Sequence, residues 1–382
     1  MALKNNTWKI NQWYDQAVAG NVSYSGAFGG FFGWGRASKG DLGQNSTAVA
    51  TYSSPIQIST NTTWNFYPAG HSFCAGENVL TKTDGTLWSW GYNNYGNLGM
   101  NTSTHISSPT QVGSSTNWST AVGARSTSFG IKTDGTLWAL GGYNSNGASG
   151  LNQAHGTKIS SPVQIPGTTW SNKIYSNNTW SGAVKTDGTL WTWGANGYGQ
   201  LGKANQTEYS SPVQIPGTTW HRMACGSEES AMATKTDGTL WFWGYNGHGG
   251  AAQNNAQYGY SSPIQIGTGT DWALGEYKNS VGQYGACGAI KTDGTLWCWG
   301  STSYGMCGDT KKYSSPVQIP GTNWNAVSNS YNRYIMATKT DGTMWTWGDN
   351  SSWMGGALFG DLAQGTKRSS PIQVPGSGDW KA

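Results

Sequence analysis

Charged side chains are scarce in this 382-residue sequence, where Asp, Glu, Lys and Arg together make up only 10% of the residues. The formal net charge is +4, and no run of Lys or Arg is longer than two residues. Domains that bind nucleic acid concentrate positive charge on a face or in a tail, so we expect no nucleic-acid partner. Long aliphatic runs are also missing, which argues against a helical bundle and against a membrane span of roughly 18 apolar residues.

Patterns for metal binding and catalysis are missing too. The five cysteines contain no C-x-x-C pair, and the five histidines fall at unrelated places in the sequence. We therefore expect no catalytic residue, no metal and no cofactor, and we interpret the cysteines as free, small, buried side chains. They are Cys74, Cys225, Cys287, Cys298 and Cys307. The start, MALKNNTWKINQW, lacks the basic and apolar regions of a secretory signal.

Glycine and tryptophan are abundant, with 57 and 23 residues, and they belong to a repeat. The phrase K-T-D-G-T-[LM]-W recurs at spacings of 50, 53, 50, 56 and 48 residues. It begins at Lys82, Lys132, Lys185, Lys235, Lys291 and Lys339. A second phrase, S-S-P-x-Q-[IV], occurs seven times, so residues 29–43 are the trace of a first unit that lacks K-T-D-G.

Each unit is predicted to form a small antiparallel sheet. Asp-Gly between two β-prone runs indicates a hairpin, and a two-residue type I′ turn at Asp84-Gly85 would pair Thr83 with Thr86. The same turn is expected at Asp187-Gly188. Alternation then places Trp88 and Trp90 on one face of the strand. The Asn/Gly-rich turn, the S-S-P strand and one further Trp complete four short strands per unit.

Seven such units of about 50 residues predict an all-β fold, a seven-bladed β-propeller of four-stranded antiparallel blades. We expect a single domain over residues 1–382, with units starting near residues 13, 64, 118, 170, 220, 272 and 324. The C-terminal PIQVPGSGDW strand and the first N-terminal strands are predicted to join and close the ring, because an open ring would expose two sheet edges.

The combination of D-G-T-L-W-x-W-G, N-x-x-G-x-L-G and S-S-P-x-Q-I resembles the regulator of chromosome condensation repeat over essentially the whole chain. The resemblance implies the propeller fold. It does not select a function, because such propellers serve as nucleotide exchange factors, chromatin readers, enzyme inhibitors and surface-recognition modules. The basic tail of the eukaryotic exchange factor has no match here. Unit three departs from the pattern at Leu140, which stands where the others have Trp.

The repeated residues are interpreted as scaffold. Asp at a fixed turn position is explained by backbone geometry rather than by calcium binding or catalysis, and the six Lys beside it are expected to be solvated. The repeated Trp could bind sugars, but their fixed place in every unit favours packing between blades. The predicted structural residues are Trp90, Trp193, Trp243, Trp299, Trp347, Asp84, Gly85, Asp187 and Gly188.

Variation is concentrated in two loops per unit, after the leading Trp and before S-S-P. Their Asn, Ser, Gly and Tyr residues suit loops that bind a partner from a rigid scaffold. Loops that only connect strands and tolerate sequence changes would have a similar composition. The candidate partner-binding residues are Glu228, Glu229, Tyr258, Tyr260, Tyr277, Lys278, Tyr284, Tyr331, Arg333 and Tyr334.

These features favour a non-enzymatic recognition or structural module. We expect a phage virion surface, tail or fibre protein, located in the virion or outside the cell, that binds a partner protein or a host-surface receptor or glycan through its loops. Virion assembly partners fit the same expectation. The alternatives are a secreted or surface inhibitor or adhesin, and a carbohydrate-binding propeller with one sugar site per unit; a cytoplasmic location is the alternative setting.

Overall fold

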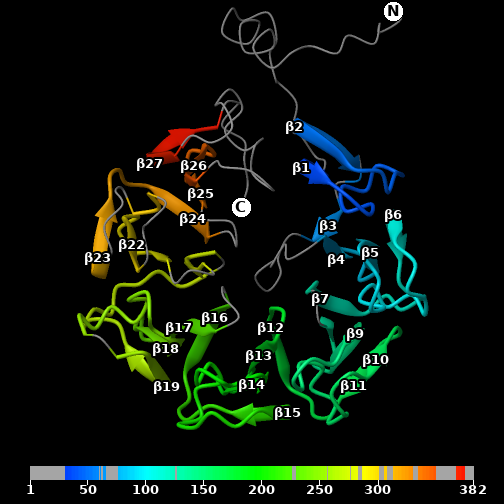
Figure 1. Cartoon of the computed structure of the whole chain (residues 1–382), viewed down its shortest axis with the longest axis horizontal. Coiled ribbons are helices and arrows are strands. Elements are labelled where there is room, and N and C mark those ends of the chain that lie inside the picture. Colours follow the sequence, from blue (N-terminus) through cyan, green and yellow to red (C-terminus); the bar gives the residue numbers. More distant parts are fainter. Residues whose placement is uncertain are drawn as a thin grey trace, which may run out of the picture.

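A computed structural model of the chain describes residues 31–59, 61, 63–65, 76–124, 127–225, 229–255, 257–275, 277–282, 286–300, 305–307, 313–329, 334–349 and 367–374. Within these residues the chain forms seven antiparallel sheets, arranged around a ring in sequence order (Figure 1). The predicted all-β class is confirmed. In the described residues no helix is long and apolar enough to cross a membrane.

The strands have the following bounds. The first sheet holds β1 (Phe31–Ala37) and β2 (Ala50–Ser59). The second holds β3 (Trp64–Asn65), β4 (Glu77–Lys82), β5 (Leu87–Gly91) and β6 (Ile106–Gln111). The third holds β7 (Trp118–Val122), β8 (Thr127–Lys132), β9 (Leu137–Tyr143), β10 (Lys158–Ile159) and β11 (Val163–Ile165). The fourth holds β12 (Trp170–Ser176), β13 (Trp180–Lys185), β14 (Leu190–Gly194) and β15 (Tyr209–Gln214).

The remaining three sheets follow the same order. The fifth holds β16 (Trp220–Cys225), β17 (Ser230–Lys235), β18 (Leu240–Tyr245) and β19 (Gly259–Gln265). The sixth holds β20 (Asn279–Val281), β21 (Cys287–Ile290), β22 (Leu296–Gly300) and β23 (Tyr313–Ile319). The seventh holds β24 (Trp324–Asn329), β25 (Tyr334–Lys339), β26 (Met344–Asp349) and β27 (Lys367–Gln373).

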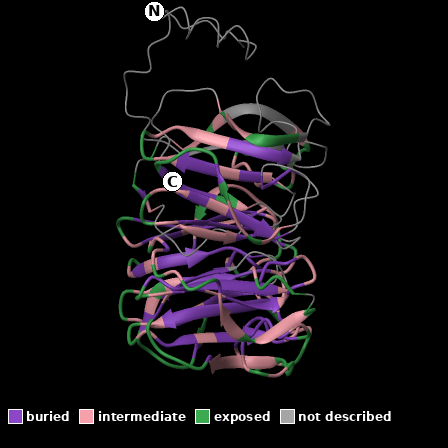
Figure 2. Cartoon of the chain, turned by 90° about the vertical axis from the view of Figure 1, so that its left-hand side faces the viewer, coloured by how far each residue is buried: buried purple, intermediate pink, exposed green. Residues whose placement is uncertain are grey.

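Within a blade the first strand lies nearest the centre of the ring and the last strand lies at its periphery, as in the order β12, β13, β14, β15 (Figure 1). Only two strands of the first sheet are described, and β27 pairs with β26 in its own blade. The C-terminal strand predicted to join the ring, PIQVPGSGDW, spans residues 371–380, and its residues 371–373 are the end of β27. Its residues 375–380 and residues 1–30, with which it is predicted to join, lie outside the described residues. Seen from the side, the strands are mostly buried and the exposed residues lie mainly in the connections (Figure 2).

Hydrogen bonds between neighbouring blades explain why the repeat is so constant. The second Trp of W-x-W is fully buried and donates its indole N–H to a turn carbonyl of the preceding blade, as Trp193 Nε1 does to Ala148 O at 3.0 Å. Trp90, Trp243, Trp299 and Trp347 make the same kind of bond. In addition, Trp220 N–H donates to Gly188 O of the preceding K-T-D-G turn at 2.9 Å. The second, fourth, fifth, sixth and seventh blades thus meet the preceding blade through the same indole contact.

The third blade lacks this indole because Leu140 takes its place, and Leu140 is fully buried among the side chains between the second and third blades. The pairing of β8 with β9 shifts between Ser128 and Phe129. The fourth strand is also divided into β10 and β11. The irregularity that the sequence shows in unit three is therefore a local rearrangement of one blade.

The hairpin turns differ from the prediction. Lys82 N–H donates to Thr86 O and Gly85 N–H donates to Lys82 O, both at 2.9 Å, so three residues form the loop instead of two. Gly85 has a φ of +78°, whereas Asp84 is not among the residues with positive φ. A type I turn followed by a left-handed glycine explains the pattern, because it assigns the single positive φ to the residue without a Cβ.

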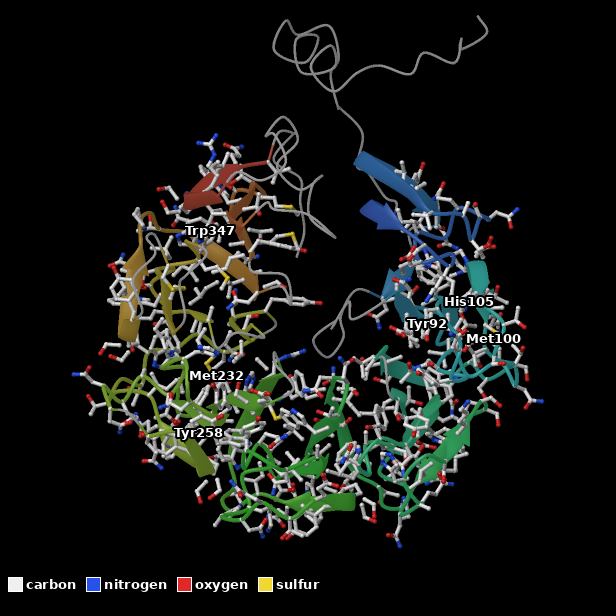
Figure 3. The ribbon with its side chains drawn as sticks, in the orientation of Figure 1. Tyr92, Met100, His105, Met232, Tyr258 and Trp347 are labelled. Carbon is white, nitrogen blue, oxygen red and sulfur yellow. A yellow bond between two sulfur atoms is a disulfide. The ribbon has the colours of Figure 1, made fainter. Side chains whose placement is uncertain are left out.

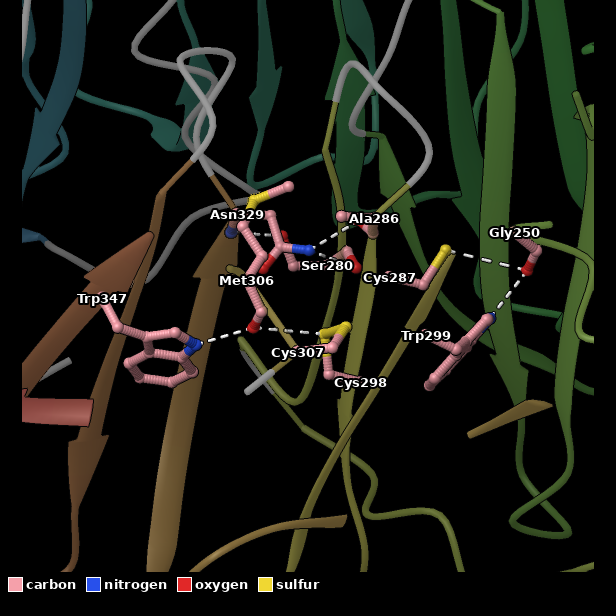
Figure 4. Close-up of a disulfide and its surroundings, with 10 residues drawn as sticks. All are labelled: Gly250, Ser280, Ala286, Cys287, Cys298, Trp299, Met306, Cys307, Asn329 and Trp347. Atoms are coloured by element: carbon pink, nitrogen blue, oxygen red, sulfur yellow. Dashed lines mark hydrogen bonds between the residues drawn. A yellow bond between two sulfur atoms is a disulfide. The ribbon is translucent and has the colours of Figure 1, made fainter. Parts of the chain in front are cut away.

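The expectation that all cysteines are free is wrong for Cys298 and Cys307, which form a disulfide (Figure 4). In two sister blades the position of Cys298 carries a hydroxyl that donates to the following turn: Ser89 Oγ donates to Leu98 O and Thr192 Oγ1 to Leu201 O, both at 2.8 Å. The disulfide joins the same two places covalently. Cys287 is buried and not disulfide-bonded, and its burial raises the pKa of its thiol.

Candidate functional site

The two ends of the strands give the ring two faces of different character. The turn face carries the K-T-D-G turns at 83–85, 133–135, 186–188, 236–238, 292–294 and 340–342, together with the linkers that enter the next blade. The loop face carries the connections between first and second strands and between third and fourth strands. Because antiparallel neighbours alternate in direction, both kinds of connection lie at the same end of every blade.

On the turn face, the lysines are not simply solvated as predicted. Lys185 Nζ lies 4.9 Å from the ring centre of Trp170 and 4.5 Å from that of Trp191. The five other K-T-D-G lysines lie in the same way against the leading Trp and the first Trp of W-x-W. An ammonium group over an indole face is an attractive cation–π contact, so these lysines hold two parts of the blade together.

The aspartates of this face are occupied within their own turns. Thr189 donates to Asp187 Oδ1 from its backbone N–H at 2.9 Å and from its hydroxyl at 2.7 Å, and the hydroxyl accepts from Trp191 Nε1 at 2.9 Å. The same relay occurs at Asp84, Asp134, Asp237, Asp293 and Asp341. No group of three or more His, Cys, Asp or Glu in the described part of the chain could hold a metal ion.

Because of this relay, the free energy of unfolding is expected to depend on pH. The hydroxyl and then the backbone N–H of the following Thr lower the pKa of each of the six aspartates in the folded protein. A depressed folded-state pKa contributes stability that is present above the unfolded value of about 3.9 and is lost as pH falls through the folded value. We expect the melting temperature to fall as the pH is lowered below about 4. Thermal unfolding followed across this range tests it, with Thr189→Val as a variant of weaker acid dependence; an equal dependence in both proteins would contradict the relay.

The loop face carries two aromatic clusters that each join neighbouring blades. The Tyr258 cluster consists of Tyr198, Tyr245, His248 and Tyr258. Its ring centres lie 4.9 Å apart for Tyr245 and Tyr258 and 6.2 Å apart for Tyr198 and Tyr258. Tyr258 is 63% exposed. A large aromatic side chain held by its neighbours and still open to solvent is suited to binding a partner.

The Tyr258 cluster also lies near a negatively charged side chain, that of Glu229. The negative charge of Glu229 raises the pKa of Tyr198, and burial followed by the charge of Tyr258 raises the pKa of Tyr245. Glu229 O also accepts the backbone N–H of Tyr245 at 2.8 Å. Glu229, directly before β17, and the aromatic residues of β18 and of the connection from β18 to β19 therefore lie on one surface.

The second group, the Tyr92 cluster, consists of Tyr92, Tyr95, His105, Tyr143 and His155. Tyr95 of the second blade and Tyr143 of the third have ring centres 5.4 Å apart. Lys39 Nζ of the first blade lies 4.3 Å from the ring centre of Tyr92. Figure 3 shows Tyr92 and His105 close together, on a different part of the ring from Tyr258.

The structure brings only some of the predicted loop residues together. Glu229 and Tyr258 belong to one surface, while the Tyr260 hydroxyl bonds with the Asn255 side chain at 3.0 Å. Lys278 has a structural contact, because its Nζ donates to Asn325 O and to Asn325 Oδ1 of the next blade, and burial lowers its pKa. Tyr277 O accepts from Val327 N–H, and Tyr334 begins β25. The predictions for Glu228, Tyr284, Tyr331 and Arg333 fall outside the described residues.

Sequence reasoning missed Tyr92, Tyr95, Tyr143, Tyr198 and Tyr245. They lie in or beside the Asn/Gly-rich turn after W-x-W-G, which was interpreted as scaffold throughout. The missed signal is a tyrosine at either of two places in that turn, as in GYNNYG, GGYNSNG, GANGYG and GYNGHG.

The fold and both faces define a β-propeller of antiparallel blades. Residues 84–129 and 187–233 match the family model described as the regulator of chromosome condensation (RCC1) repeat. The structure is similar to human WBSCR16, with a TM-score of 0.72 and 16% identity, covering 90% of this chain and 93% of that one.

It is similar as well to yeast RCC1 (Prp20) in a complex with Kap60, with a TM-score of 0.71 and 14% identity, covering 98% of this chain and 89% of that one. For Prp20p from Saccharomyces cerevisiae the TM-score is 0.73 and the identity 16%, covering 90% and 85%. The chain therefore contains repeats that match the RCC1 repeat, and its fold is that of the RCC1-like seven-bladed propellers.

Proposed function

We propose that this chain is a non-enzymatic protein-binding module that engages its partner through the loop face. The observation that carries the proposal is the Tyr258 cluster, in which an exposed tyrosine is held by rings from two blades beside Glu229. Binding energy at protein interfaces is concentrated in a few aromatic and Arg residues on a rigid base. The Tyr92 cluster supplies a second group of the same kind.

The structural relatives support the proposal that the partner is a protein. Yeast RCC1 has been crystallised bound to Kap60, and the S. cerevisiae Prp20p structure is described together with binding to Gsp1p and histones. We transfer from them only the general property of binding proteins. Loops on a rigid scaffold carry recognition in many folds, and here the rigid scaffold is the repeated inter-blade contact.

The test is retention of a partner on the immobilised protein from an extract of its own source. We expect Tyr258→Ala to weaken the interaction by about 2 kcal/mol or more, roughly 30-fold in Kd. Val163→Ala is the matched control, because Val163 is a partly exposed apolar residue, at 37%, on β11. Equal loss in both variants, or no loss with Tyr258→Ala, would contradict binding through this face.

We also propose the finer assignment to a virion surface, tail or fibre. Low charge, near-identical repeats and richness in Gly and Trp support it. Purified particles from the source should contain the protein in fixed ratio to the major structural protein. Its consistent absence from them would leave the secreted or surface inhibitor or adhesin as the better assignment.

A further inference from the structure

The innermost strands of the fourth, fifth and sixth blades carry a basic residue at the same place in the chain. In each blade this place directly precedes the residue that pairs with the position two before the K-T-D-G lysine. The three basic residues are Lys173, Arg222 and Lys278. The second, third and seventh blades have uncharged residues there, namely Asn65, Thr120 and Ala326. Positive charge is therefore concentrated on one sector of the inner wall of the ring.

At two junctions between blades, the side chain at this place donates to the next blade. Asn65 Nδ2 donates to Ser119 O of the third blade at 3.4 Å. Lys278 Nζ donates to the main-chain O and to the Oδ1 of Asn325 in the seventh blade, the latter at 2.9 Å. Ser119 and Asn325 both directly follow a leading Trp, where the strand pairing shifts. The residue after the leading Trp thus supplies the acceptor at both junctions.

The junction between the fourth and fifth blades differs, because its two basic side chains have no acceptor. The residue after the leading Trp of the fifth blade is His221, again where the pairing shifts. No hydrogen bond or ion pair joins the side chain of Lys173 or of His221 to any residue that the structure describes. The Nδ1 atom of His221 is buried without a partner. Lys173 is therefore not satisfied by the next blade in the way that Lys278 is.

Positive charges are also close together at this junction. Burial, followed by the charge of Arg222, lowers the pKa of Lys173. Burial, followed by the charges of Lys173 and Arg222, lowers the pKa of His221 to about 4. Every charge that shifts these two pKa values is positive. Basic groups that lose hydration without gaining a negative partner raise the free energy of the folded state.

The neighbouring strands bring these groups into one site. β12 and β16 contact each other on the inner side of the ring (Figure 1). The guanidinium carbon of Arg222, a residue only 8% exposed, lies 5.9 Å from the ring centre of Tyr175 on β12. Lys173 is only partly buried, so a solute can reach its ammonium group. The arrangement places a buried guanidinium behind two accessible nitrogen donors, which favours an anionic ligand.

We propose that Lys173, His221 and Arg222 form an anion site on the inner wall of the ring, and that its ligand is the phosphate group of a small molecule. Phosphate oxygens accept from the Lys173 ammonium and from a ring N–H of His221, while Arg222 adds positive charge. Phosphate suits donors on separate strands because it presents several charged oxygens in different directions. The site lies near the turn face, since Trp220 N–H, directly before His221, bonds with Gly188 O of the K-T-D-G turn. It is separate from the protein-binding loop face and does not depend on it.

Isothermal titration of the full chain with pyrophosphate and with inorganic phosphate, at constant ionic strength near pH 7, tests the site. We expect one site with a Kd of about 1 mM or tighter for pyrophosphate. Lys173→Gln should weaken binding at least about tenfold, because a charge-assisted hydrogen bond is lost. Without ligand, Lys173→Gln should not lower the melting temperature, because it removes one of several positive charges that repel each other.

Lys278→Gln is the matched control, because it removes the basic residue at the same place of the sixth blade. Burial alone lowers the pKa of Lys278, and its ammonium group is already bonded to Asn325. This variant should bind pyrophosphate at wild-type strength and melt at a lower temperature. His221→Asn places at the fifth blade the residue that accepts from Lys278 at the seventh. It should weaken pyrophosphate binding, because Asn then competes for Lys173.

Three outcomes would overturn the proposal. The first is no binding of either phosphate compound, and the second is equal weakening of binding by Lys173→Gln and Lys278→Gln, or by neither. The third is a rise in the melting temperature with pyrophosphate that sodium chloride reproduces at the same ionic strength. That result would show general screening of positive charge and not a phosphate site.

Discussion

Trp193→Ala should lower the free energy of unfolding by about 3–5 kcal/mol, the usual cost of removing a large aromatic side chain from a packed interior. Trp193 is fully buried between the third and fourth blades, among Phe129, Ile165 and Trp170. Its indole also donates to Ala148 O at 3.0 Å, so the substitution leaves a buried carbonyl without its donor. Chemical denaturation followed by circular dichroism measures the effect.

Two further variants separate the contributions of the hydrogen bond and of the buried ring to this loss of stability. Trp193→Phe keeps a ring but removes the hydrogen bond, and should cost about 1–3 kcal/mol. Trp191→Ala removes a half-buried indole of the same strand and should cost less than Trp193→Ala. Unchanged stability of Trp193→Ala would refute the assignment of the repeated Trp to contacts between blades.

Gly85→Ala should be among the most damaging single-methyl additions in the molecule. Gly85 has a φ of +78°, and the added Cβ would lie 2.0 Å from the backbone oxygen of Thr116. A left-handed conformation costs a residue with a side chain about 1–3 kcal/mol, and forced movement of packed backbone costs a further 1–3 kcal/mol or so. We expect a loss of about 2–5 kcal/mol in the free energy of unfolding.

Gly188→Ala is the matched control for this substitution. Gly188 has the same φ of +78°, but its added Cβ would lie 3.1 Å from the nearest atom, Thr219 N. Gly188→Ala should therefore show mainly the conformational cost, about 1–3 kcal/mol. Equal losses in the two variants would mean that the linker at 112–117 does not press on the turn as the structure shows.

Much of the scaffold could be predicted because the same strand and turn pattern recurs in unit after unit of the sequence. The alternation that puts Trp88 and Trp90 on one face holds, since both rings contact Trp64, at 5.9 and 5.8 Å. The turn type could not be read from Asp-Gly alone. The side chain of Thr86, two residues after Asp84, donates to its carboxylate at 2.6 Å, and this local hydrogen bond accompanies a three-residue loop.

The disulfide and the lysine contacts could not be predicted from the sequence, because they depend on which segments the fold brings together. Cys298 and Cys307 are nine residues apart, and only the fold of the turn brings their Cα atoms to 5.3 Å. Likewise, Lys185 meets Trp170 because two strands lie side by side. On the loop face, Tyr198 and Tyr258 come from turns of different blades, so their proximity follows from the ring and not from either segment.

The central claim is that the repeated turn face supports the ring while the loop face binds a protein. Hydrogen exchange of the chain, alone and with its captured partner, tests it most directly. We predict protection of the loop-face segments 195–208 and 246–258, with the K-T-D-G turns 186–188 and 236–238 unchanged. Protection confined to the K-T-D-G turns and linkers, with the loop-face segments unchanged, would contradict the claim.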